Sequence, residues 1–79
     1  MATFEKVLSL LRQGKSVELK IYLVGGLFGR HLLSLEGGKI RDFSYVDDST
    51  NICSIKEYKA SFYGKAFRKK CVKIDEVYS

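Results

Sequence analysis

The side chains with the potential for catalysis or metal binding are few and scattered along the sequence. They are His31, Cys53, Cys71, Asp42, Asp47 and Asp48. These residues supply neither the four ligands of a zinc site nor the spacing of a calcium loop. No motif places a nucleophile beside the histidine, although catalytic groups can also meet in space. We therefore predict no catalytic residue, metal or cofactor.

One structural arrangement would favour an enzyme instead. It is His31 lying close to Cys53 or Asp42 in a concave pocket, with perturbed proton affinities. In a reducing compartment we expect Cys53 and Cys71 to be buried or half-buried thiols, with a disulfide as the alternative.

A glycine-rich run, Gly25-Gly26-Leu27-Phe28-Gly29-Arg30, has the composition of a phosphate-binding loop. It lacks the Lys-Ser/Thr ending of a P-loop and leads into a predicted strand instead of a helix. The run therefore favours a flexible hairpin connection, with Phe28 near its tip as a candidate contact residue.

Positive charge is concentrated in the last third of the chain. The net charge is +5, but residues 56–73 hold seven basic residues and one acid, 7 − 1 = +6, so the remainder carries 7 − 8 = −1. Such a cluster is either a solvated edge that discourages strand pairing or a contact surface for anions. This basic cluster comprises Lys56, Lys59, Lys65, Arg68, Lys69, Lys70 and Lys73.

Hydrophobic periodicity predicts the elements that must position these residues. Apolar residues at helical spacing, beginning at Phe4 and ending at Leu11, predict a helix over Thr3–Gln13. Alternating residues predict strands over Ser16–Val24, Arg30–Glu36 and Lys39–Val46. Gly37-Gly38 joins the last two strands as a tight hairpin, and the polar residues 47–51 predict a loop.

A second helix is expected after this loop. Ser54 and Glu57 have the spacing of a capping box, and Gly64 is the preferred helix end, with a longer helix to about Lys70 as the alternative. Cys71–Tyr78 then looks extended. The expected fold is α+β, a single domain over residues 1–79 with the order α-β-β-β-α(-β). Its small antiparallel sheet has three to four strands and carries the helices on one face.

The tight hairpin also predicts which side chains share a face of the sheet. It pairs Glu36 with Lys39 and continues outward, so alternation assigns the rings of Phe43 and Tyr45 to the face opposite the helices. A bulge near Asp42 would exchange part of the two faces. The predicted binding surface comprises Tyr22, Phe28, Arg30, Leu32, Arg41, Phe43 and Tyr45.

The expected element order resembles that of double-stranded-RNA-binding domains, in topology alone. Residues 54–59 do not reproduce that family's run of lysines at the start of the second helix, and residues 27–31 lack its proline. We therefore do not assign the chain to that family.

These observations lead to two hypotheses of different classes. Exposed apolar groups without catalytic residues favour a small non-enzymatic module that binds a protein partner or a second copy of itself. Such a modulator or adaptor is of a kind that phages and mobile elements encode. The alternative is nucleic-acid binding, with the basic cluster contacting phosphates and the aromatic face stacking on bases. We expect a cytoplasmic protein with no signal peptide, no membrane segment and no small-molecule substrate.

Overall fold

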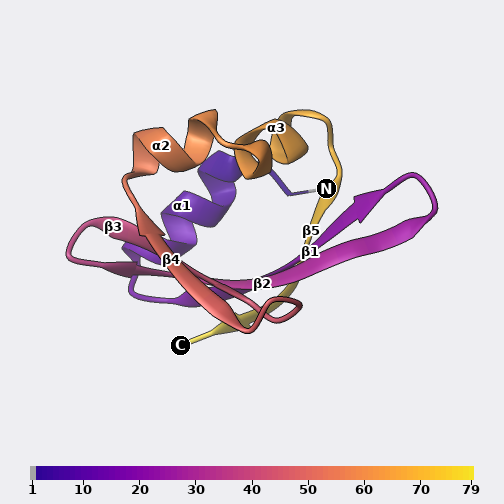
Figure 1. Cartoon of the computed structure of the whole chain (residues 1–79). Coiled ribbons are helices and arrows are strands. Elements are labelled where there is room, and N and C mark those ends of the chain that lie inside the picture. Colours follow the sequence, from indigo (N-terminus) through magenta and orange to yellow (C-terminus); the bar gives the residue numbers. More distant parts are fainter. Residues whose placement is uncertain (1) are drawn as a thin grey trace.

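The computed structural model describes residues 2–79 and shows an α+β fold with three helices and a five-stranded antiparallel sheet (Figure 1). The strands lie in the order β4-β3-β2-β1-β5. No helix in the described part of the chain is long and apolar enough to cross a membrane. The elements are α1 (Phe4–Arg12), β1 (Ser16–Leu23), β2 (Gly26–Glu36), β3 (Lys39–Ser44), β4 (Ser49–Cys53), α2 (Ile55–Ala60), α3 (Phe62–Arg68) and β5 (Val72–Tyr78).

The first helix follows the predicted pattern closely. Thr3 caps it by accepting a hydrogen bond from the backbone N–H of Lys6 at 3.2 Å, and Phe4, Val7 and Leu11 are buried. Gly14 has a φ of +83° just after the helix end. A left-handed residue at this position ends a helix without steric strain when it is glycine.

The hairpin of β2 and β3 has the register that its two-residue turn predicts. Glu36 faces Lys39, Leu32 faces Phe43 and no shift occurs near Asp42. The register shifts lie elsewhere, between Ile21 and Tyr22 where β1 pairs with β2, and between Glu18 and Leu19 where β1 pairs with β5.

The sheet has more strands than predicted. Residues 49–53, expected to be mostly loop, form β4 and pair with β3, so that Phe43 faces Thr50 and Arg41 faces Ile52. The terminal segment is a strand as expected, but it is the fifth strand and pairs with β1. Polar residues adopt the strand here because β3 offers hydrogen-bonding groups along its edge, which outweighs their weak intrinsic preference.

The second predicted helix is divided into two. Ser54 and Glu57 form the expected capping box at the start of α2, but the helix ends at Ser61, whose ψ of 177° is extended. The Ser61 side chain then caps α3. Gly64 therefore does not end a helix. It lies inside α3, where an added Cβ would be 1.9 Å from the Lys59 carbonyl oxygen, so only glycine permits this close approach of the two helices.

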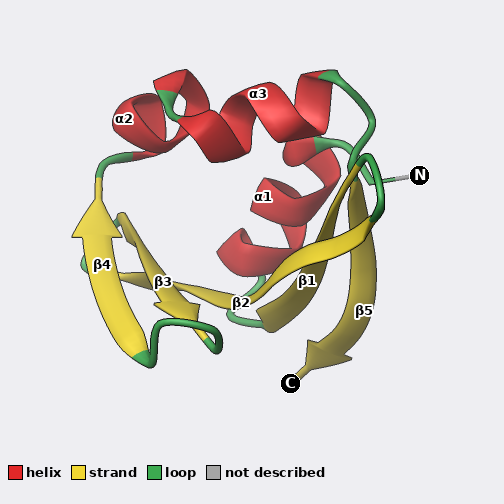
Figure 2. Ribbon diagram, turned by 45° about the vertical axis from the view of Figure 1, so that its right-hand side comes forward, coloured by secondary structure: helices red, strands yellow, loops and turns green. Residues whose placement is uncertain are grey.

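All three helices cover one face of the sheet and leave the other uncovered (Figure 2). The core lies between these layers, where Leu19, Ile21, Leu33 and Ile40 of the sheet are almost completely buried. The uncovered face is the surface on which we expected binding residues.

Candidate functional site

The open face, which we define as the helix-free side of the sheet, carries a mixture of rings, aliphatic groups and cations. Leu32 and Phe43 are half-buried, Tyr45 is 40% exposed, and the Phe43 and Tyr45 rings meet edge to face at 5.1 Å. Strand register and alternation place six of the seven predicted binding residues on this face: Tyr22, Arg30, Leu32, Arg41, Phe43 and Tyr45.

Phe28, the seventh predicted binding residue, lies apart from this group. The β1–β2 register pairs Ile21 with Gly29 and Tyr22 with Leu27, so Phe28 is the extra residue of a bulge. Its ring contacts that of Phe62 in α3, with 5.5 Å between the centroids. Phe28 therefore belongs to the helix-covered side of the molecule.

Glu18 organises the charges of the open face. Its side chain is nearly buried, although strand alternation directs it away from the core. Arg30 Nη2 donates to Glu18 Oε2 at 2.7 Å, and the Tyr78 hydroxyl donates to Glu18 Oε1 at 3.1 Å. The Tyr45 hydroxyl lies 3.5 Å from the same oxygen, and the Arg30 guanidinium lies 5.0 Å from the centre of the Tyr45 ring.

A second ion pair lies beside this group. Lys20 Nζ is 3.2 Å from an oxygen of Asp75. The hydrogen bond to Glu18 raises the pKa of both Arg30 and Tyr78, and the hydrogen bond from Lys20 lowers the pKa of Asp75. Two of the cations on the open face are therefore already neutralised by carboxylates of the same chain.

The basic cluster is exposed along its whole length. Lys56 and Lys59 lie on α2, four members lie on α3 or the turn after it, and Lys73 faces Lys20 on the sheet. Among residues 2–79, the only ion pair of a cluster member joins Lys59 to Glu5 at 3.7 Å. The cluster thus presents mostly free charge, and all of it except Lys73 lies in the helical layer, opposite the open face.

The helix-covered side contains the buried polar pair of His31 and Asp42, whose proximity the sequence analysis gave as one condition for an enzyme. His31 Nδ1 lies 2.7 Å from Asp42 Oδ1, and the two residues are 3% and 6% exposed. The Tyr63 ring covers His31 edge to face at 4.7 Å, and Tyr58 stacks on Tyr63.

Of the conditions that would favour an enzyme, this pair meets proximity but does not lie in either hollow found near the chain's N-terminal residues. Burial, followed by the charge of Asp42, raises the pKa of Tyr58 and Tyr63. The pair is packed beneath the helices and acts as part of the core.

The two cysteines are free thiols, and both are half-buried. Burial, followed by the charge of Glu57, raises the pKa of Cys53. A raised pKa keeps a thiol protonated and poorly nucleophilic, which is the behaviour of a structural cysteine.

Three residues of the open face were missed as contributors to the site. Ile52, 51% exposed, was placed in no binding surface because its strand was not predicted. Alternation along β1 puts Glu18 on this face, but nothing in the sequence signals its burial. Tyr78 reaches Glu18 across a separation of 60 residues, and finding it needs the pairing of β5 with β1.

Comparisons of the chain with protein-family models, with curated proteins and with solved structures find no match. The class that the fold and this surface define is a small α+β domain with one uncovered sheet face. Any functional proposal therefore depends on the chemistry of that face and of the helical layer.

Proposed function

We propose that this protein is a non-catalytic interaction module that binds a protein partner through the open face of its sheet. The observation that carries the proposal is the combination of half-exposed apolar side chains with two cations, Lys20 and Arg30, that are already paired. Leu32, Phe43 and Ile52 supply apolar surface, while Glu18 holds Arg30. Contiguous exposed apolar surface with a polar border is typical of protein-interaction sites.

The aromatic residues on this face suit a binding hot spot. The Phe43 and Tyr45 rings are held against each other, and Tyr45 is further restrained by the guanidinium of Arg30. Restrained rings lose little conformational freedom on binding, and aromatic residues and arginine are enriched in hot spots. We expect Phe43 and Tyr45 to be the main anchors.

The test is capture of partners from a host lysate with and without nuclease, using the wild type and the variant Phe43→Asp. A partner bound through the open face is retained after nuclease treatment and lost with Phe43→Asp. The control is Lys65→Asp, which introduces the same acid on an exposed site of the helical layer and makes an even larger charge change. Equal capture by all three proteins would contradict the proposal.

Light scattering distinguishes the two kinds of protein partner. A second copy as partner gives a dimer that Phe43→Asp dissociates, whereas a different protein leaves the isolated chain monomeric. Both results agree with an interaction module, and they show whether the partner of the open face is a second copy of the chain or a different protein.

A second candidate function, nucleic-acid binding, is favoured by one observation. The basic cluster is exposed and mostly unpaired, which is the arrangement needed for contacts with phosphates. Every member of the cluster except Lys73 lies in the helical layer, opposite the aromatic face, so base stacking on Phe43 does not accompany phosphate contact there. Binding to labelled RNA or DNA at ~50 mM salt that weakens by orders of magnitude at ~200 mM would support this candidate.

A further inference from the structure

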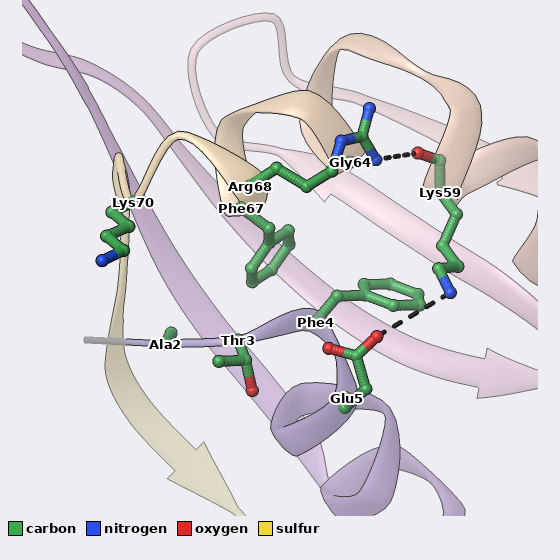
Figure 3. A pocket seen from close by; sticks show the side chains of 9 residues that line it. All are labelled: Ala2, Thr3, Phe4, Glu5, Lys59, Gly64, Phe67, Arg68 and Lys70. Carbon is green, nitrogen blue, oxygen red and sulfur yellow. Dashed lines mark hydrogen bonds and ion pairs between the residues drawn. The ribbon is translucent and has the colours of Figure 1, made fainter.

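A hollow of about 470 Å³ lies between the start of α1 and the packed helices α2 and α3 (Figure 3). Its lining includes four buried residues, Ala2, Phe4, Gly64 and Phe67. The Phe4 and Phe67 rings meet edge to face, with centroids 5.6 Å apart, and the Phe67 ring extends from α3 toward α1 (Figure 3). This volume lies within the range of about 300–1,000 Å³ that ligand sites usually have.

The rim of this hollow is cationic. Lys59, Arg68 and Lys70 line it together with one acid, Glu5, which gives 3 − 1 = +2. Lys59 Nζ lies 3.7 Å from Glu5 and 6.0 Å from the centre of the Phe4 ring, while Arg68 Nη1 donates to the Lys59 carbonyl oxygen at 3.2 Å. Arg68 and Lys70 therefore carry the net positive charge, and the Lys70 side chain lies on the side of the hollow away from Lys59 (Figure 3).

We propose that this hollow binds an acidic peptide segment of a partner protein, with one aromatic or large aliphatic side chain inserted against Phe4 and Phe67. Charge complementarity argues for this occupant, because the rim cations attract carboxylates on both sides of the inserted side chain. The apolar floor supplies the burial that charge alone does not.

The polar lining argues against a small polar metabolite as the occupant. Sites for such ligands fix orientation with a few rigidly placed polar groups. Here the charged groups are long and exposed, and the floor is formed by hydrocarbon and ring atoms. A segment of protein chain can present several carboxylates around one apolar anchor and so match both features.

This site lies on the helical layer and is independent of the proposed binding through the open face. Phe43→Asp therefore leaves peptide binding unchanged, and failure of either proposal can be recognised separately. The basic cluster divides accordingly, since Lys59, Arg68 and Lys70 border the hollow and Lys65 and Lys69 do not.

The experiment uses a short fluorescent peptide with one central phenylalanine flanked by aspartates and glutamates, and measures polarisation at ~50 mM salt. A matched peptide carries alanine at the centre. We expect the phenylalanine peptide to bind the full chain at least about tenfold more tightly, because its ring becomes buried.

The double variant Lys59→Glu/Lys70→Glu reverses two rim charges and should weaken binding about tenfold. Its control, Lys65→Glu/Lys69→Glu, makes the same charge change outside the hollow and should weaken binding by less than about threefold. Equal binding of the two peptides, or equal loss with both double variants, would overturn the proposal, since either result means that charge alone attracts the peptide. Displacement of the phenylalanine peptide by an oligonucleotide of equal charge would overturn it in favour of nucleic acid.

Discussion

Arg30 and His31 are neighbours in β2, yet they serve opposite faces of the sheet. Each holds a carboxylate with a nitrogen-to-oxygen distance of 2.7 Å: Arg30 holds Glu18 on the open face, and His31 holds Asp42 under the helices. The surroundings differ. The Arg30 side chain is 43% exposed, whereas those of His31 and Asp42 are 3% and 7% exposed.

Two pairs with the same nitrogen-to-oxygen distance can therefore contribute differently to the stability of the fold. Water competes for the Arg30 guanidinium and screens its charge, although Glu18 is only 5% exposed, so solvent compensates for loss of that pair on the arginine side alone. The buried pair has no such alternative, and removal of one partner leaves the other desolvated. The open face can therefore rearrange when it meets a partner, while the covered face is restricted to one arrangement.

The largest effect is expected from His31→Leu. The substitution keeps the size of the side chain but leaves Asp42 buried without its partner, which should lower the free energy of unfolding by ~3–5 kcal/mol. Urea denaturation followed by circular dichroism measures the loss.

The double variant His31→Leu/Asp42→Leu sharpens this result. It removes the unpaired carboxylate as well, so part of the stability lost in His31→Leu should return. If the single and double variants are equally unstable, the loss comes from packing and the contrast between the two pairs is wrong.

A smaller effect is expected from Arg30→Met on the open face. Glu18 loses its cation but keeps the hydrogen bond from the Tyr78 hydroxyl. The urea midpoint should fall by less than with His31→Leu. Arg41→Met is the control, because Arg41 lies on the same face and forms no ion pair among the described residues. If Arg30→Met lowers the urea midpoint as much as His31→Leu does, the proposed difference between the two pairs is wrong.

Removal of an unpaired polar group from the covered face should increase the free energy of unfolding. The Tyr58 hydroxyl is buried with no hydrogen-bond partner in the described part of the chain. Tyr58→Phe should therefore raise the free energy of unfolding by ~1 kcal/mol at neutral pH. A loss of stability would show that this hydroxyl has a partner.

The raised pKa of Tyr58 also predicts that the folded state becomes less stable at alkaline pH. Burial raises this pKa in the folded chain above the ordinary value of 10.0. The free energy of unfolding is therefore unaffected by this group below pH 10 and decreases as the pH rises further, because the unfolded chain then releases the proton more readily than the folded chain. The urea midpoint of the wild type should fall above that pH, and Tyr58→Phe should fall less.

The smallest effect is expected from Asp75→Asn at the exposed pair with Lys20. The pKa of Asp75 is lowered below 3.8 in the folded chain, so the pair's contribution is present above that pH and is lost as the pH falls through the folded pKa. The variant should lose slightly less stability than the wild type between pH ~7 and pH ~3 in thermal melts. Asp48→Asn, a change at an exposed turn, should show the wild-type pH dependence.

Several features of the candidate site were predictable from local pattern. Gly37-Gly38 predicts the β2–β3 register, and that register places Arg41 and Phe43 on the face opposite the helices. Phe28 was not predictable in the same way, because a bulge in β2 takes it out of the alternation and turns it toward Phe62.

The sequence by itself determined the elements whose signals lie within a few residues. The apolar stripe of α1, its Thr3 cap, the alternation of β1 and the glycine turn each depend on near neighbours, for which spacing is sufficient information. These signals also established that one face of the sheet is apolar and the other mixed.

Only the tertiary structure decided the features that depend on distant partners. The polar residues of β4 form a strand because β3 lies beside them, and the close approach at Gly64 arises from the packing of α3 on the end of α2. Glu18 is buried because Tyr78, on the last strand, folds across it. Hydrogen bonding and desolvation depend on which groups lie nearby in space. A short stretch of sequence does not reveal those neighbours, because they come from distant parts of the chain.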